Sequence, residues 1–250
     1  MEIDAPPGFT CRYLESVGST SDSSKALAAD GAPDGTAIAA GEQTAGRGRY
    51  GRRWASPPGN LYMSVLLRDV GPLHQAAQLS FVAAVAMGEA LSALTPEGLA
   101  PRFKWPNDLL LDGRKVAGVL LESGGPSGAP WIVIGTGVNL SSHPRDATTP
   151  ATDLAAEGAE IAAPALAARY LAALARWRER WRAQGFAPVR AAWLAAAHNR
   201  GGAVQVRIEG RAPRAGRFVD IAEDGALLLE PAGGGPVERI SAGEVHFPGE

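Results

Sequence analysis

The run Gly41–Trp54 reads GEQTAGRGRYGRRW and decides between two kinds of fold. Its glycines Gly46, Gly48 and Gly51 fit the G-x-G-x-x-G spacing of dinucleotide-binding folds. That motif needs a helix directly afterwards, so that a pyrophosphate can lie on the helix N-terminus. The next residues, Ala55–Gly59, contain two prolines and a glycine, which deny a helix its first turn. The context therefore excludes a Rossmann fold.

The same stretch carries four arginines, Arg47, Arg49, Arg52 and Arg53. Glycine lets the backbone come close to a ligand, and guanidinium groups match carboxylate and phosphate oxygens bidentately. The alternatives are a solvated basic turn or a nucleic-acid patch. A nucleic-acid patch usually belongs to a basic chain, whereas this chain has a formal net charge of -2. The stretch favours a mobile loop that closes over a small anionic molecule.

The composition is that of a globular protein with one large domain, or with one large and one small domain. The 250 residues suffice for a full core, and 46% are hydrophobic. The single Cys11 excludes an internal disulfide framework and a CxxC metal site. No secretory signal or membrane span is visible, so we expect a cytoplasmic protein. The histidines are scattered without metal-ligand spacing: His74, His143, His198 and His246.

Lysine usage points to a second region of interest. Of the 24 basic residues only Lys25, Lys104 and Lys115 are lysines, and two of these lie within one short window. An ammonium is a compact point charge that guanidinium does not replace where one oxygen must be gripped in a tight space. The window from Lys104 to Lys115 is therefore the second candidate site.

The first two thirds of the chain predict an antiparallel sheet covered by helices on one face. Asp112-Gly113 is a strong hairpin signal between two apolar strands. The expected strands are Thr36–Ala40, Asn60–Leu67 as its antiparallel partner, Lys115–Glu122 and Trp131–Leu140. The expected helices are Ser23–Ala29, which Ser19, Thr20, Ser21 or Asp22 can cap, and Leu73–Leu94.

The rest of the chain predicts two helices and then a small β-rich unit. An apolar stripe at helical spacing is expected to face the core: Leu166, Tyr170, Leu174, Trp177 and Trp181. A second helix is expected over 188–197. Strands at Val204–Ile208, Gly216–Asp220, Ala226–Leu229 and Val237–Ile240 predict a small β-barrel without catalytic residues. We therefore expect an α+β fold with a catalytic domain over 1–199 and a barrel over 200–250.

Four motifs in this order resemble the biotin protein ligases. They are GRGRYGR at 46–52, KWPND at 104–108, RKVAG at 114–118 running into Leu120-Leu-Glu122, and GTGVN at 135–139. The resemblance covers about Ser19 to Val245. It implies a catalytic domain like that of class II synthetases, with a mixed, mainly antiparallel sheet. It also implies that the tail containing Gly243-Glu-Val245 is an SH3-like barrel.

The resemblance implies a reaction in two steps. Biotin and MgATP give biotinyl-5′-AMP and pyrophosphate, and the acyl group then passes to a lysine of a biotin carboxyl carrier protein. A carboxylate must approach the α-phosphate of ATP, so positive charge has to neutralise both anions. Arg47 and Lys115 match the catalytic positions that grip these oxygens. Losing such a contact at Lys115 costs on the order of 3 kcal/mol in the transition state.

The resemblance also assigns the binding residues. The positions implied for biotin are Ser19, Thr20, Gln43, Gly46, Arg47, Lys115 and Gly118. Those implied for ATP or AMP are Arg47, Arg49, Arg52, Trp54, Asn107, Asp108, Lys115 and Asn139. Trp54 would pack on adenine, and Asp108 would contact Mg²⁺, which prefers carboxylate and amide oxygens. For Lys104 and Trp105, support of their strand and a direct site role both stay open.

The chain departs from the family at Ser21, where the family usually has Asn after the Ser-Thr pair. A hydroxyl does not reproduce the donor and acceptor of an amide, although Asp22 or water can substitute. About eighteen residues precede Ser19, too few for the helix-turn-helix of the repressor members, so we predict no specific operator binding. The carrier is expected to belong to a biotin-dependent carboxylase, usually acetyl-CoA carboxylase. A homodimer through a sheet edge stays open.

Two rival functions remain at this stage. A lipoate or octanoate protein ligase or transferase shares the fold and the acyl-transfer chemistry. The arginine loop, the KWPND run and the tail favour biotin. A non-catalytic module that senses a biotin-like ligand is the rival from another class. Pyrophosphate incorporation that requires biotin and not lipoate distinguishes all three.

Overall fold

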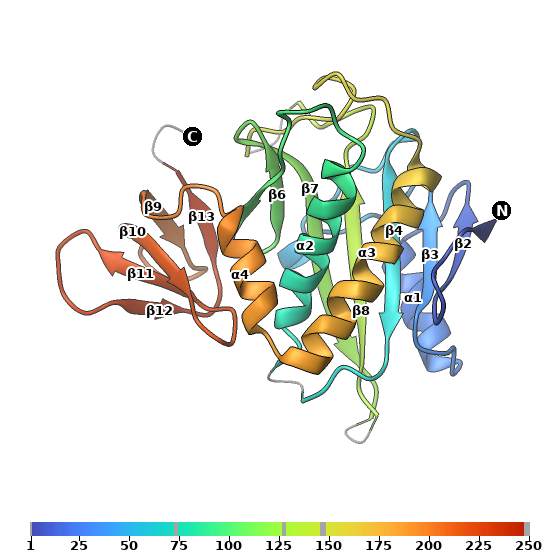
Figure 1. Ribbon diagram of the computed structural model, residues 1–250, viewed down its shortest axis with the longest axis horizontal. Coiled ribbons are helices and arrows are strands. Elements are labelled where there is room, and N and C mark those ends of the chain that lie inside the picture. The colour runs from blue at the N-terminus through green and yellow to red at the C-terminus, as the bar shows by residue number, and fades with distance from the viewer. Residues whose placement is uncertain (1, 73–74, 127–128, 146–148, 248–250) are drawn as a thin grey trace.

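A computed structural model describes residues 2–72, 75–126, 129–145 and 149–247 of the chain. Its larger sheet has the strand order β1-β2-β3-β4-β8-β7-β6-β5 (Figure 1). Only β2 and β3 pair in parallel; the other neighbours are antiparallel, so the sheet is mixed and mainly antiparallel as predicted. The strands are β1 Glu2–Ile3, β2 Thr10–Leu14, β3 Thr36–Ala40, β4 Leu61–Leu67, β5 Arg102–Lys104, β6 Asp108–Leu111, β7 Arg114–Gly124 and β8 Trp131–Val138.

The predicted hairpin joins β6 to β7. Asp112 and Gly113 both have positive φ, 46° and 73°, which is the conformation that an Asp-Gly turn supplies at low cost. The predicted pairing of β3 with β4 is also present, with Ala39 opposite Met63. These predictions are confirmed because turn chemistry and short apolar strands are properties of a few consecutive residues.

Helices cover both faces of this sheet, which corrects the expectation of a single covered face. The helices α2 (Gln78–Ser92) and α3 (Ala163–Gln184) pack on one face, while α1 (Thr20–Ala29) lies on the other (Figure 1). On β4, Met63 and Val65 belong to the main core, whereas Leu66 packs with Ala28 of α1 and Val133 in a separate cluster. Every residue of β4 is buried for this reason.

The predicted aromatic stripe on α3 faces the core. Leu166, Tyr170, Leu174 and Trp181 are buried, and Trp177 is partly buried against the same cluster. The helix expected over 73–94 begins at Gln78, and residues 73–74 lie outside the described residues. No helix within the described ranges is long and apolar enough to cross a membrane.

The C-terminal part forms a five-stranded antiparallel sheet in the order β12-β11-β10-β9-β13. Its strands are β9 Ala203–Arg207, β10 Arg214–Ile221, β11 Leu227–Pro231, β12 Glu238–Ile240 and β13 Glu244–His246. The sequence analysis missed β13. The helix α4 (Ala187–Ala195) lies between this sheet and α2 (Figure 1). Trp193 of α4 contacts Phe81, Phe103 and Phe218, so one core joins both sheets.

Candidate active site

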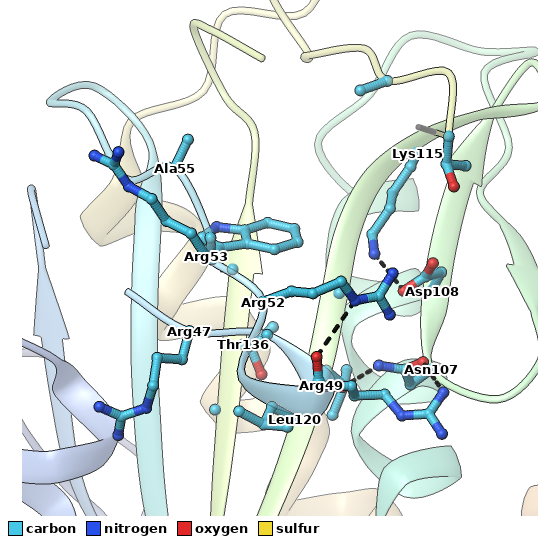
Figure 2. Close-up of a pocket in the computed structure, with 18 of the residues that line it drawn as sticks. Arg47, Arg49, Arg52, Arg53, Ala55, Asn107, Asp108, Lys115, Leu120 and Thr136 are labelled. Carbon is cyan, nitrogen blue, oxygen red and sulfur yellow. Dashed lines mark hydrogen bonds and ion pairs between the residues drawn. The ribbon is translucent and has the colours of Figure 1, made fainter. Parts of the chain in front are cut away.

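A cavity of about 480 Å³ lies between the arginine loop and the larger sheet (Figure 2), and residues of β13 also line it. It brings together nearly all the predicted site residues, including Arg47 and Lys115. The exception is Gly46, which does not line it. A Cβ at Gly46 would lie 2.4 Å from Ser56 Oγ and 2.7 Å from the Trp54 carbonyl oxygen, so this glycine permits two chain segments to meet. The predicted residues that line the cavity are Ser19, Thr20, Gln43, Arg47, Arg49, Arg52, Trp54, Asn107, Asp108, Lys115, Gly118 and Asn139.

One end of the cavity is a network of uncharged polar groups. Gln43 Oε1 accepts hydrogen bonds from the backbone N–H of Thr20 at 2.8 Å and from its hydroxyl at 3.0 Å. Gln43 Nε2 donates to Ser56 Oγ at 3.1 Å. Ser64 Oγ lies 2.8 Å from Thr20 Oγ1 and 3.1 Å from Ser21 Oγ. These groups are held in one arrangement and present donors and acceptors without net charge.

Ser19 is the N-cap of α1, as predicted for one of the four candidate residues. Its hydroxyl accepts a hydrogen bond from the backbone N–H of Asp22, 3.4 Å away. Capping places Thr20 and Ser21 in the first turn, facing the sheet, where both are buried. The helix start therefore positions the polar end of the cavity.

Glycines form the floor of the cavity. A Cβ at Gly137 would lie 2.7 Å from two atoms of the Trp54 indole, and one at Gly135 would lie 2.8 Å from Ser21 Oγ. At Gly118 the nearest atoms, on Trp54 and Lys115, would be 3.3–3.4 Å away. Because these positions have no side chains, other groups pack directly on the backbone of β7 and β8.

The arginine stretch is a folded turn in this structure. The N–H of Gly48 donates to the Arg52 carbonyl at 2.7 Å, and that of Trp54 donates to the Gly46 carbonyl at 3.0 Å. A short 3-10 turn, η1, spans Arg49–Gly51 at its tip. Tyr50 at this tip has a φ of 56° and a side chain that is more than half exposed. The stretch is thus held at its base while its tip stands in solvent.

Three of the loop arginines have defined partners. Arg47 pairs with both carboxylate oxygens of Asp22, on α1. Arg49 donates to the carbonyl oxygen of Gly243 at 3.1 Å, and Arg52 pairs with Glu244. The Arg47 hydrogen bonds, offset in part by burial, lower the pKa of the Asp22 carboxyl to about 2. The loop is therefore joined by ion pairs both to α1 and to the C-terminal sheet.

Lys115 is aimed by a bulge in the sheet. The register of β6 and β7 shifts between Leu109 and Leu110, so that Leu109 faces Ala117 while Leu110 faces Lys115. Such a bulge redirects the neighbouring side chains. The Lys115 ammonium lies 2.6 Å from Asp108 Oδ1 and 5.2 Å from the centre of the Trp54 ring. Figure 2 shows Lys115 pointing to Asp108 across the cavity from Arg47.

Comparison with known proteins assigns the chain to a family. A model of the Biotin/lipoate A/B protein ligase family matches residues 13–139, and a model of the biotin protein ligase C-terminal domain matches residues 201–247. The chain belongs to the biotin/lipoate A/B protein ligase family. The resemblance drawn from the four motifs is thereby confirmed.

Relatives and solved structures agree with this assignment. The biotin–[acetyl-CoA-carboxylase] ligase of Paracoccus denitrificans is 42% identical over 219 residues, which are 85% of this chain and 90% of the relative. The biotin protein ligase of Aquifex aeolicus in complex with biotin and ATP is 28% identical, with a TM-score of 0.79 over 94% of this chain and 97% of that one. The Leishmania major ligase in complex with biotinyl-5-AMP is 29% identical, with a TM-score of 0.66 over 95% and 100%.

The C-terminal sheet of this ligase-family chain takes part in the site, which the sequence analysis did not predict. Glu244, Val245 and His246 of β13 line the cavity. The indole Nε1–H of Trp105 donates to the carbonyl of Gly225 at 2.9 Å and ties the KWPND segment to the same sheet. Trp105 also lines the cavity, so its position fits both support of its strand and a direct role in the site.

Four other motif residues line the cavity, and three of them also contact the segments around it: Lys104, Asn107 and Asn139, with Asp108 as the fourth. Lys104 is buried, and its ammonium lies 4.7 Å from the centre of the Phe247 ring. Asn107 donates from Nδ2 to the carbonyl of Val119 at 2.5 Å, and Asn139 donates to that of Thr152 at 2.9 Å. These two amides hold the segments around Lys115 in place. Only Asp108 among the four offers a carboxylate to the cavity.

Ser56 and Ser64 support the site residues from behind the cavity lining, and sequence reasoning missed both. Both belong to the polar network around Gln43, and Ser64 is fully buried. A signal was available for Ser64, because it is the one hydroxyl in the otherwise apolar strand Leu61–Leu67 apart from the phenol of Tyr62. A buried hydroxyl needs a partner, so such a residue indicates a neighbouring polar group.

Proposed function

We propose that this protein activates biotin with ATP to biotinyl-5′-AMP and transfers the biotinyl group to a lysine of a biotin carboxyl carrier protein. The supporting observation is the division of one cavity into an uncharged polar end around Gln43 and a charged end around Lys115. Biotin has the same division, because its ureido ring is neutral and its carboxylate is anionic.

At the polar end, the ureido group would meet the hydroxyls of Ser19 and Thr20 and the amide of Gln43. A ureido group has two N–H donors and one strongly accepting oxygen, so it needs partners of both kinds. The Gly118 backbone, beside Trp54 and Lys115, would border the bicyclic ring. Ser21 would act through Ser64, to which its hydroxyl is bonded, and not as the amide that the family usually has.

At the charged end, the carboxylate oxygen of biotin attacks the α-phosphorus of ATP and pyrophosphate leaves. The Lys115 ammonium would contact both anions where they meet, because it lies beside the cavity floor, next to the Asp108 carboxylate. Arg49 and Arg52 would face the phosphates from the loop. Fixed positive charge in a site that excludes water stabilises the transition state more than the same charge in solvent.

Mg²⁺ would enter with ATP. Magnesium is typically held by one or two carboxylates together with substrate phosphates. Asp108 and the amide of Asn107 provide one carboxylate and one amide beside the cavity, which fits a metal shared with the nucleotide. Within the described residues no group of three or more His, Cys, Asp or Glu forms a separate metal site. Bound Mg²⁺ would supply charge neutralisation at the phosphates.

In the second step, the amine of the carrier lysine attacks the acyl carbon and gives up one proton, and AMP leaves with the electron pair of the broken C–O bond. Trp54 would pack on adenine, because its indole already lies on the bare backbone at Gly137. We propose a cytoplasmic location. We also propose that the carrier belongs to a biotin-dependent carboxylase such as acetyl-CoA carboxylase, which appears in the name of the Paracoccus relative.

Exchange of labelled pyrophosphate into ATP tests the proposal. Adenylate formation is reversible, so exchange should require biotin and should not occur with lipoate or octanoate in its place. Exchange with lipoate or octanoate alone would support the rival ligase, which also forms an acyl-adenylate. Biotin binding without any exchange would support a sensing module. Transfer is then measured as label on a biotin carboxyl carrier domain, with a variant lacking the acceptor lysine as the control.

A further inference from the structure

The Arg47 guanidinium is already occupied by a carboxylate. Its Nη1 donates to Asp22 Oδ2 at 2.7 Å, and its Nη2 donates to the other oxygen of the same carboxylate. Figure 2 shows the Arg47 side chain directed away from Lys115 and Asp108. A bidentate charge-assisted pair is the strongest form of this contact and fixes the orientation of both groups.

Asp22 has a second cationic partner that extends the contact to the sheet. The Lys25 ammonium lies 2.9 Å from Asp22 Oδ1 and 2.7 Å from Glu122 Oε1. Arg47 belongs to the loop, Asp22 and Lys25 to the first two turns of α1, and Glu122 to β7. Alternating charges therefore join three segments along one side of the cavity, which Arg47 and Glu122 line.

The helix start favours a carboxylate at this position. Asp22 lies in the first turn of α1, where the helix dipole stabilises negative charge. The adjacent Ser21 turns inward and forms a hydrogen bond with Ser64, so Ser21 belongs to the polar network while Asp22 faces the loop. Asp22, the residue directly after Ser21, thus carries the negative charge that pairs with the arginine loop.

We infer that Asp22 is a positioning residue that anchors the arginine loop through Arg47 and so keeps the activated acyl group enclosed. The anchor holds Arg47, one of the two residues that the resemblance names for gripping the reacting oxygens, while Lys115 lies across the same cavity. The anchor is a contact between two residues of this chain, so its mechanical effect does not depend on the proposed function. Its effect on catalysis does rest on that function.

Trypsin cleavage of the ligand-free protein tests the anchor directly. Asp22→Asn should raise the rate of cleavage after Arg49, Arg52 and Arg53 by about fivefold, which corresponds to about 1 kcal/mol for a partly exposed pair. Asp22→Glu should restore the slow rate, because it keeps the charge. Glu230→Gln removes the carboxylate of a comparable exposed pair with Arg217 in the C-terminal sheet and should leave loop cleavage unchanged.

A double-mutant cycle separates an anchor from two independent roles. Arg47→Gln should match Asp22→Asn in loop cleavage, and the double variant should not exceed either single variant. The anchor would be overturned if the double variant raised loop cleavage by the product of the two single effects, or if Asp22→Asn left loop cleavage unchanged. An equal rise of cleavage in the C-terminal sheet would also overturn it, because this would indicate global loss of stability.

The catalytic readout is the rate at which bound biotinyl-adenylate dissociates, measured by chasing labelled adenylate with unlabelled biotin. Asp22→Asn should release the adenylate about fivefold faster, with the rate of its formation changed less than twofold. An equal loss in formation and retention would contradict positioning by Asp22. Absence of biotin-dependent exchange in the wild-type protein would refute the proposed function while the cleavage result stands by itself.

Discussion

Gly137→Ala tests whether Trp54 forms a wall of the nucleotide site. The added Cβ would lie 2.7 Å from Nε1 and Cε2 and 2.9 Å from Cζ2 of the Trp54 indole, distances at which one group must move. The backbone of β8 is held by pairing on both sides, with Gly137 opposite Tyr62 and Gly118. Trp54 lies at the base of a loop, so the indole is the group that shifts.

The magnitude follows from this clash. Overpacking of a well-packed contact costs about 1–3 kcal/mol, which corresponds to about 5- to 150-fold in affinity. Most of this cost should appear in ATP binding, because the displaced indole no longer offers its face to adenine. The free energy of unfolding should change by less than about 1 kcal/mol, since the loop can absorb the shift.

The assay is the KM for ATP in biotin-dependent pyrophosphate exchange, alongside thermal unfolding. Gly18→Ala is the control, because its Cβ would meet nothing within 4 Å and Gly18 does not line the cavity. We expect Gly137→Ala to raise the KM at least fivefold and Gly18→Ala to leave it within twofold. A KM within twofold of the wild type for Gly137→Ala would refute the packing of Trp54 on this backbone in the working complex.

The remaining predictions concern charge. Lys115→Met should slow adenylate formation by about 100-fold, the loss of one transition-state contact on the order of 3 kcal/mol, in single-turnover measurements. Glu244→Gln releases Arg52 and should raise the KM for ATP about two- to fivefold, while an unchanged KM would remove β13 from the site. Burial by itself raises the pKa of the Asp34 carboxyl, but its hydrogen bonds, including those from buried Arg178, outweigh burial and lower this pKa. The charged carboxylate therefore stabilises the fold at pH values above its unfolded pKa near 3.8, and this stabilisation is lost as the pH falls below that value. Asp34→Asn should therefore lower the free energy of unfolding by about 2 kcal/mol at pH 7, with a smaller difference near pH 3 in urea titrations.

Local sequence signals predicted much of the fold. The Asp112-Gly113 turn and the neighbouring apolar segments Thr36–Ala40 and Asn60–Leu67 correctly gave two strand pairings. The proline and glycine residues after Trp54 correctly excluded a helix there. The face covered by α1 was not predictable, because a short alanine-rich helix fits either side of a sheet. It depends on Leu66 and Val133, which become apparent only when the register is known.

The site was predictable as a set of residues and less so as a set of contacts. The motifs identified the residues that line the cavity, with Gly46 as the exception. The contribution of β13 was missed because Glu244 is about 190 positions from its partner Arg52, and no local pattern reports such a contact. The pairing of Asp22 with Arg47 was missed for the same reason, although both residues had been singled out.

A crystal structure of the protein grown with biotin and ATP tests the central claim most directly. We predict continuous density for biotinyl-5′-AMP in the cavity, with the ureido ring bonded to Thr20 and Gln43. The phosphoryl group should lie within hydrogen-bond distance of the Lys115 ammonium. Density for the ligand outside this cavity, or a bound adenylate with Lys115 still directed only to Asp108, would contradict the account.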